Sequence, residues 1–116
     1  MTNNKAGHFA EFLARIYMRF GGWKIIAKNV ITGKGTHSGE IDFIVVKNKT
    51  IVFVEVKKRT NLETAAYAIN PIQQQRIRNG ATAFLKKNPQ FAEYNIRFDA
   101  VLIAFPCRIR HIENAF

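Results

Sequence analysis

The order of hydrophobic and polar residues divides the chain into segments with two different periods. Residues 5–20 and 71–87 repeat apolar side chains every three or four positions, which is typical of amphipathic helices. Asn70 and Pro71 favour the start of the second helix, because asparagine caps helices and proline fits their first turn. Five other segments are rich in β-branched and aromatic residues and are predicted strands: 23–30, 39–47, 50–59, 96–105 and 108–112.

The order of these segments predicts an α/β fold. A helix between the third and fourth strands requires a crossover connection, and hence a mixed sheet. Both faces of the hairpin between Phe43 and Val56 are apolar, so helices should cover the sheet on both faces. A chain of 116 residues can bury one core, and we expect a single domain spanning residues 1–116, with a mixed sheet of about five strands.

Charged residues interrupt the apolar hairpin. Glu40, Asp42, Glu55 and Lys57 all lie within its two strands. Such groups cost several kcal/mol in a buried strand unless they are paired or bound to a metal ion. A bound divalent cation is the favoured interpretation. A buried ion-pair triad without metal is the alternative, but two carboxylates that face one lysine leave negative charge uncompensated.

The register of the hairpin decides whether the carboxylates meet. If the strands close with Lys47 opposite Thr50, then Asp42 lies directly opposite Glu55 on the same face. A slip of one residue would send the two carboxylates to opposite faces. Asn48-Lys49 is a weaker turn signal than Asn-Gly, so a longer or bulged loop is the alternative.

The first predicted helix carries two stripes of apolar residues. One is large and contains Phe9, Phe12, Leu13, Ile16 and Phe20, with Tyr17 at its edge. The other is roughly opposite and contains Gly7, Ala10, Glu11, Ala14 and Met18. Small residues in the second stripe would let a strand or helix approach closely, with Glu11 in that approach. Periodicity alone favours an ordinary solvated carboxylate for Glu11.

The charge of the chain indicates a polyanionic partner. Eighteen Lys and Arg residues against eight Asp and Glu give a net charge of +10. Such a field attracts nucleic acid above all, although an acidic protein or membrane surface is an alternative. Cys107 is the only cysteine, which fits a reducing compartment. Because no segment resembles a secretory signal or a membrane helix, we expect a cytoplasmic protein without membrane contact.

Basic residues near the predicted hairpin and on the second helix are candidate DNA contacts. Lys58 and Arg59 leave the strand where a phosphate backbone would pass, and Lys34 lies in a glycine-bearing loop. That loop lacks the spacing of a phosphate-binding P-loop. On the second helix, Arg76 points away from the predicted buried face, which carries Ile77, Ala81, Phe84 and Leu85, with Gln73 and Gln74 flanking it. A solvated helix face explains Arg76 equally well, and a solvated loop residue is the favoured interpretation of Lys34.

Asp99 is an acidic residue of a predicted strand that lies outside this set. Asp99 stands two residues after Arg97 at the start of the fourth predicted strand. The pair is interpreted as a local ion pair, and Asp99 is therefore left out of the candidate site.

The order Asp42, Glu55, Lys57 is the D-(x)n-E-x-K arrangement, and it resembles the PD-(D/E)XK nuclease superfamily. The proline that usually precedes the first acid is missing, because Ile41 stands there. This resemblance implies a restriction-endonuclease-like core. It also implies a divalent cation, Mg²⁺ or Mn²⁺, held by Asp42 and Glu55 with the Val56 carbonyl.

Over nearly its whole length the chain resembles the small, largely uncharacterised YraN-type family of predicted endonucleases. The family usually has a lysine where this chain has Gln73, which leaves any phosphate contact from that position open. The matching features are Gly7, Glu11 and Ala14 in the first helix, Asn29, GEID at 39–42, FVEVKKR at 53–59, QQQRI at 73–77, RFDAV at 97–101 and the terminal NAF.

The chain is also similar to archaeal Holliday-junction resolvases, which share a helical glutamate and the same interval between the aspartate and the glutamate. This likeness adds Glu11 to the candidate catalytic residues Asp42, Glu55 and Lys57. Lys57 would orient the attacking water or neutralise charge, and Glu11 would hold a metal-bound water or a second ion. Glu40 and Gln74 are further candidates.

The resemblance thus implies a metal-dependent DNA endonuclease, selective for branched or damaged DNA, and a resolvase-like role would favour a symmetric homodimer. The alternative is a nucleic-acid-binding module with a nuclease fold that cleaves little or nothing and acts with a partner, because a fold does not fix an activity.

Overall fold

The structure is a computed structural model that describes residues 5–32, 39–59, 69–104 and 108–116. The predicted helices and strands are all present, with ends that differ from the prediction by two residues at most. The elements in chain order are α1 (Lys5–Phe20), β1 (Lys24–Thr32), β2 (Gly39–Lys47), β3 (Thr50–Arg59), α2 (Pro71–Lys87), the 3-10 helix η3 (Pro89–Phe91), β4 (Asn95–Ala104) and β5 (Arg108–Ile112).

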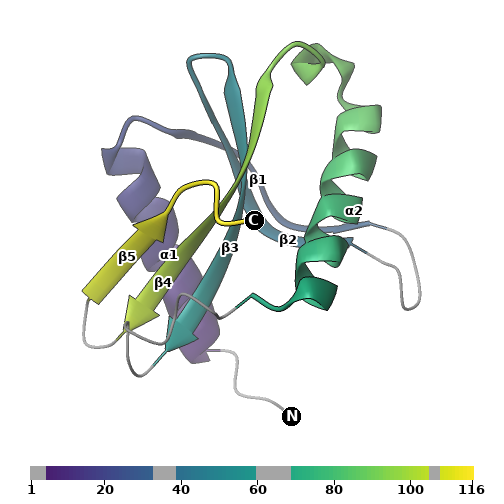
Figure 1. The fold of residues 1–116 in the computed structure, drawn as a ribbon. Coiled ribbons are helices and arrows are strands. Elements are labelled where there is room, and N and C mark those ends of the chain that lie inside the picture. The colour runs from purple at the N-terminus through teal and green to yellow at the C-terminus, as the bar shows by residue number, and fades with distance from the viewer. Residues whose placement is uncertain (1–4, 33–38, 60–68, 105–107) are drawn as a thin grey trace.

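The five strands form one mixed sheet in the order β1-β2-β3-β4-β5 (Figure 1). Neighbouring strands are antiparallel except for β3 and β4, which are parallel. The parallel pair is connected through α2, the crossover that the order of segments predicts. The α/β fold class with a mixed sheet is therefore confirmed, and the arrangement is consistent with a restriction-endonuclease-like fold. No helix in the described part of the chain is long and apolar enough to cross a membrane.

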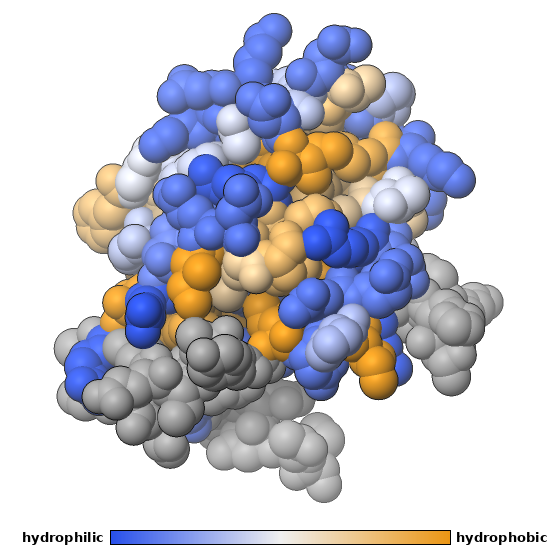
Figure 2. Space-filling view, in the orientation of Figure 1, coloured by the Kyte–Doolittle hydropathy of each residue, from blue (hydrophilic) through white to orange (hydrophobic). Residues whose placement is uncertain are grey.

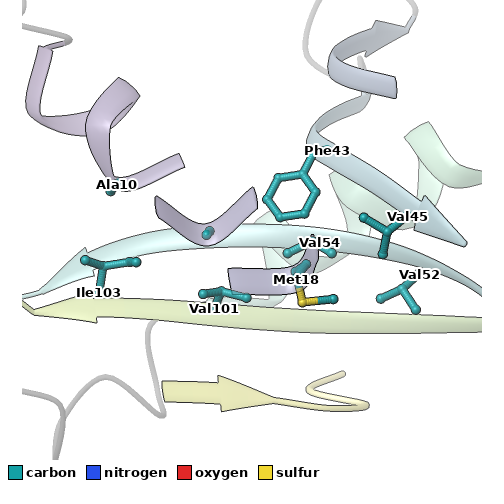
Figure 3. Close-up of a cluster of buried hydrophobic side chains, with 9 residues drawn as sticks. Ala10, Met18, Phe43, Val45, Val52, Val54, Val101 and Ile103 are labelled. Atoms are coloured by element: carbon teal, nitrogen blue, oxygen red, sulfur yellow. The ribbon is translucent and has the colours of Figure 1, made fainter. Parts of the chain in front are cut away.

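The two helices pack on opposite faces of the sheet. Beneath α1 lies a cluster of buried side chains from β2, β3 and β4, which Figure 3 shows with Phe43, Val54 and Val101 next to Met18 of the helix. A second cluster, beneath α2, joins Ile44, Ile51 and Phe53 of the sheet to Ile77 and Ala81 of that helix. The hairpin is thus buried on both faces, as its two apolar sides predict.

The sheet contacts the small stripe of α1. Ala10, Ala14 and Met18 are at most 1% exposed, and they bring the helix close to the central strands. Of the large stripe, Leu13 packs against the edge of this cluster, whereas Phe9, Phe12 and Phe20 are exposed, Phe20 by 89%. Because small side chains face the sheet, the α1 backbone and the side chains that flank this stripe, including Glu11, come near the strands.

A two-residue turn sets the register of the β2–β3 hairpin. Asn48 and Lys49 have φ values of 48° and 60°, which is the left-handed conformation that type I′ turns require. Lys47 then pairs with Thr50, and the register continues to Phe43 opposite Val54. The predicted tight closure is confirmed, and the longer or bulged loop is not formed.

Helix α2 packs against both strands of the hairpin, with Gln73 of its first turn bonded to Glu55 and Gly80 in contact with Gly39. Asn70 caps the helix, with its Oδ1 accepting a hydrogen bond from Gln73 N at 2.8 Å. Further along the helix, Gly80 packs so closely on Gly39 that a Cβ on Gly39 would overlap Gly80 backbone atoms. This glycine–glycine contact holds β2 against α2 just before the charged part of the hairpin.

The predicted Arg97–Asp99 ion pair is confirmed and belongs to a larger network. Asp99 is fully buried and accepts two hydrogen bonds from Arg97, both at 2.9 Å. His111 Nε2 lies 2.7 Å from Asp99 Oδ2, and the Asn114 backbone N–H donates to Oδ1 at 3.1 Å. Burial alone would raise the pKa of Asp99, but these hydrogen bonds outweigh burial and lower it. Asp99 therefore ties β5 and the residues after it to β4.

Candidate active site

The β2–β3 ladder ends where the charged residues begin. Backbone pairing stops at Phe43 and Val54. Beyond this pair, the Asp42 side chain takes over, and its Oδ2 accepts a hydrogen bond from Val56 N at 2.7 Å. A side-chain carboxylate thus occupies the position of a backbone acceptor, and the two strands separate around it.

The alternation of side-chain faces along β2 also breaks at Asp42. Phe43 belongs to the cluster beneath α1, whereas Ile41 belongs to the cluster beneath α2. In a regular strand these two residues would share a face. At this break Asp42 has one acidic neighbour on each side of the sheet. On the α1 side the neighbour is Glu11, and on the α2 side it is Glu55, which is hydrogen-bonded to that helix.

A hydrogen bond joins the carboxyl groups of Asp42 and Glu55. Only 6% of Glu55 is exposed. Burial, followed by the charge of Asp42, raises the pKa of Glu55 to about 8. Burial also raises the pKa of Asp42, against the opposing effect of the Val56 N–H. At neutral pH the pair therefore retains a proton, which sits between two carboxyl groups that would otherwise repel each other.

Two donors from different elements hold Glu55. Lys57 Nζ lies 3.1 Å from Glu55 Oε2, and Gln73 Nε2 donates to the same oxygen at 2.8 Å. Lys57 stands two residues further along β3, on the same side of the strand. Gln73 comes from the first turn of α2, which Asn70 and Pro71 fix in position. The site is therefore assembled from the hairpin and the start of the crossover helix.

A cavity of about 300 Å³ opens next to Asp42, between α1, β1 and β2. Glu11 and His8 line it from α1, and Asn29 lines it from β1. Burial, followed by the charge of Asp42, raises the pKa of Glu11. Asn29 has φ 54°, a left-handed conformation that asparagine tolerates, and it lies on β1 between two residues paired with Phe43 and Ile41. The structure thus brings the helical glutamate to the hairpin.

The remaining predicted site residues differ in whether they lie beside Asp42 and in how exposed they are. Glu40 is exposed but lines the cavity beside Asp42. Lys58 follows Lys57 at the exposed end of β3, and Arg76 is exposed on α2. Lys34 and the side chain of Arg59 lie outside the residues that the structure describes.

Gln73, and not Gln74, is the glutamine that contacts the acidic pair. Gln74 Nε2 donates to the Ile69 carbonyl at 2.9 Å and so stabilises the segment that leads into α2. The sequence marks the start of α2 clearly, but it does not show which side chain of the first turn reaches Glu55. His8 was likewise not predicted, because its position follows from how α1 docks on the sheet.

The donor set fits a hard divalent cation. The carboxyl groups of Asp42 and Glu55 share a hydrogen bond, and its proton offsets their repulsion. Carboxylate oxygens are also the ligands that Mg²⁺ and Mn²⁺ prefer, so such an ion could take the place of this proton. In an extended strand the N–H and C=O of one residue point to the same side. The Val56 carbonyl therefore faces the Asp42 side of β3, as its N–H does. The described residues include no group of three or more His, Cys, Asp or Glu side chains that could hold a metal.

Comparison with known proteins matches residues 10–103 to the model of the uncharacterised protein family UPF0102. The UPF0102 protein amb4503 of Paramagnetospirillum magneticum is 41% identical over 113 residues, which cover 97% of this chain and 87% of the relative. The UPF0102 protein bll0669 of Bradyrhizobium diazoefficiens is 43% identical over 112 residues, which cover 97% and 81%. A UPF0102 protein of Rhodopseudomonas palustris strain BisB18 is 42% identical, with 97% and 80% covered. These names state no activity.

Proposed function

The chain belongs to the uncharacterised protein family UPF0102, the YraN-type family that its motifs predict, and we propose that it is a metal-dependent endonuclease that hydrolyses phosphodiester bonds in DNA. The observation that carries the proposal is the hydrogen-bonded pair Asp42 and Glu55 with Lys57 beside it, at the opening between β2 and β3. Two buried carboxyl groups that repel each other are an unfavourable arrangement for a purely structural role. A cation supplies the compensation that the fold lacks.

Asp42, Glu55 and the Val56 carbonyl are the residues that would hold Mg²⁺ or Mn²⁺. Such an ion lowers the pKa of a bound water and stabilises negative charge on phosphate oxygens. The carboxyl pair must release its shared proton for both oxygens to become ligands. Asp42 is fixed by the Val56 N–H and Glu55 by Gln73, so both oxygens are preoriented.

Lys57 provides the positive charge of the site. Its ammonium group now pairs with Glu55 at 3.1 Å. Once Glu55 is bound elsewhere, the three donors of Lys57 can orient the attacking water or neutralise a phosphate oxygen. Glu11, across the cavity from Asp42, is positioned to hold a water molecule by hydrogen bonding. Glu40 lines the same cavity and is a further candidate for this task.

DNA is the proposed substrate because of charge. The chain carries a net charge of +10, so it attracts polyanions although its candidate site is acidic. In the view of Figure 2 the described surface is mostly hydrophilic, with apolar residues gathered towards the middle of this face. Lys58, directly after Lys57, and Arg76 on α2 are proposed to contact the phosphate backbone. Branched or damaged DNA is the proposed preference, in line with the resolvase-like arrangement.

The test is cleavage of labelled linear, single-stranded, flap and four-way DNA with Mg²⁺ or Mn²⁺. We expect wild type to cut at least one substrate, and Asp42→Asn and Lys57→Ala to lose at least about a hundredfold in rate. Glu93→Gln is the matched control, because Glu93 is an exposed carboxylate outside the site. Cleavage by Glu93→Gln but not by the other two variants would also exclude a contaminating nuclease, because a contaminant would copurify equally with all three variants.

Two outcomes oppose the proposal in different ways. Unchanged cleavage in Asp42→Asn and Lys57→Ala would refute the site. Tight DNA binding by wild type without cutting of any substrate would favour the alternative, a binding module that acts with a partner.

A further inference from the structure

A second cavity, of about 280 Å³, lies between α1 and β1. Three cationic side chains line it, two from the helix and one from the strand. The remaining walls are aliphatic. Its lining residues are Arg15, Arg19, Ile25, Ile26, Ala27 and Lys28.

This basic cavity directly continues the acidic one. Arg15 follows Glu11 by four residues, and Arg19 follows Arg15 by four, so the three side chains advance in steps of about 6 Å along one flank of α1. On the opposite wall, Lys28 lines the basic cavity and the next residue, Asn29, lines the acidic one. The two cavities are therefore consecutive parts of one boundary between α1 and β1.

In the part of the chain that the structure describes, most cations of this boundary have no acidic partner within salt-bridge distance. Within the described residues, neither Arg19 nor Lys28 forms a salt bridge. Arg15 interacts with Glu11 through its charge, one helical turn away. Beside these side chains, β1 is an edge strand with a bulge between Ile25 and Ala27, so Ile26 lacks a partner in β2. The basic cavity thus lies beside an edge strand whose pairing with β2 is interrupted at Ile26.

We propose that the cavity formed by Arg15, Arg19 and Lys28 binds the phosphodiester backbone of a DNA strand on one side of the bond cleaved at the acidic cavity. The proposal rests on the proposed function, and it adds the path of the bound strand along α1. Arginine suits this role because its planar guanidinium donates two parallel hydrogen bonds to phosphate oxygens. The aliphatic walls from β1 suit contact with deoxyribose. The strand then runs along α1 from Glu11 towards the helix C-terminus.

The experiment is a DNA-binding titration without divalent metal, over a series of salt concentrations. The test variant is Arg15→Gln with Arg19→Gln. The control is Lys86→Gln with Lys87→Gln, which removes the same charge from the exposed C-terminal end of α2, the end opposite to Gln73. Thermal melting verifies that both variants remain folded.

Log affinity falls linearly with log salt, and each lost phosphate contact makes this slope less steep by about 0.7 to 0.9. We expect the slope of the Arg15/Arg19 variant to fall by about 1.5, and the slope of the control to stay close to that of wild type. Equal slopes in the two variants, or no DNA binding by wild type, would overturn the proposal. A further measurement adds inorganic phosphate at the same concentration as the phosphate groups of the DNA. If inorganic phosphate displaces the DNA fully, the cavity binds a free anion and the proposed strand path is refuted.

Failure here and failure of the nuclease proposal are distinguishable. Binding in the absence of metal requires no cleavage. If wild type binds DNA through Arg15 and Arg19 but never cuts it, the nuclease proposal is refuted and the proposed strand path stands. If wild type cuts DNA but the Arg15/Arg19 variant binds as tightly as wild type, only the proposed strand path is refuted.

Discussion

Asp42 and Glu55 share a hydrogen bond between their carboxyl groups at the point where β2 separates from β3. The arrangement places two acids in contact within a largely buried site, where Lys57 and the proton between the two carboxyl groups offset their repulsion. Its cost in stability and its proposed capacity to hold a cation have the same physical origin.

Stability should fall with rising pH because of Glu55. Its pKa is about 8 in the folded protein against an ordinary value of 4.5, so folding favours the protonated form. The stabilisation is complete below pH 4.5 and is lost as the pH rises through about 8. Urea unfolding across this window should show a declining free energy for wild type and a flatter profile for Glu55→Gln. Glu93→Gln, an exposed control, should follow wild type, and a flat wild-type profile would contradict the prediction.

Mg²⁺ should offset that loss. A cation that replaces the shared proton stabilises the folded state, and its binding releases a proton. We expect Mg²⁺ to raise the melting temperature of wild type more at the alkaline end of the window than at the acidic end. Asp42→Asn should show no such rise. An equal rise in wild type and in Asp42→Asn would mean that the ion acts elsewhere on the protein.

Asp99 should be important for stability and independent of metal. It is fully buried and holds Arg97, His111 and the Asn114 backbone N–H. Asp99→Asn leaves Arg97 without its charged partner and should lower the free energy of unfolding by about 3 kcal/mol. Glu113→Gln removes only the exposed, 3.7 Å partner of Arg97 and should cost less than about 0.5 kcal/mol. Chemical denaturation of both variants measures the difference, and similar losses would contradict the network.

The contact between Gly39 and Gly80 should tolerate a methyl group on one side only. A Cβ on Gly39 meets backbone atoms of Gly80, which cannot move independently of α2. A Cβ on Gly80 meets chiefly the flexible end of Ile41, at 3.1 Å, and alanine favours the helix by about 1 kcal/mol. Gly39→Ala should therefore lose about 2 kcal/mol or more, and Gly80→Ala less than about 1 kcal/mol. Thermal unfolding of the two variants tests this order.

The sequence predicts the local parts of this molecule well. Apolar periodicity locates both helices, and the tight turn at Asn48 and Lys49 follows from the alternation on either side of it. That turn sets the register that brings Asp42 to Glu55. These features depend on neighbouring residues, whose preferences the sequence displays directly.

The sequence does not predict contacts that depend on packing between distant elements. Gln73 reaches Glu55 because the crossover returns α2 to the hairpin opening, and Gly39 meets Gly80 for the same reason. The change of face at Asp42 runs against the regular alternation that defines a strand in a sequence. Each of these is a tertiary effect, which overrides the local pattern.

Gln73 should tune the pH dependence of cleavage. Its amide donates to Glu55 at 2.8 Å without adding charge. Gln73→Lys would place an ammonium group near Glu55, favour the carboxylate, and lower the pKa of Glu55. Because the ionised carboxylate is the proposed metal ligand, the acidic limb of the rate–pH profile should move by about one unit to lower pH. Gln73→Leu should move it to higher pH.

Gln75→Lys is the matched control for this shift. Gln75 is two residues further along α2, is exposed, and pairs with Asn79 at 3.0 Å, so a lysine there adds the same charge away from Glu55. Single-turnover cleavage over a pH series should therefore give a wild-type profile for Gln75→Lys. If Gln73→Lys and Gln75→Lys shift the limb equally, the effect is one of net charge on DNA binding. A shift confined to Gln73→Lys means that the titrating group is the carboxyl group that Gln73 contacts.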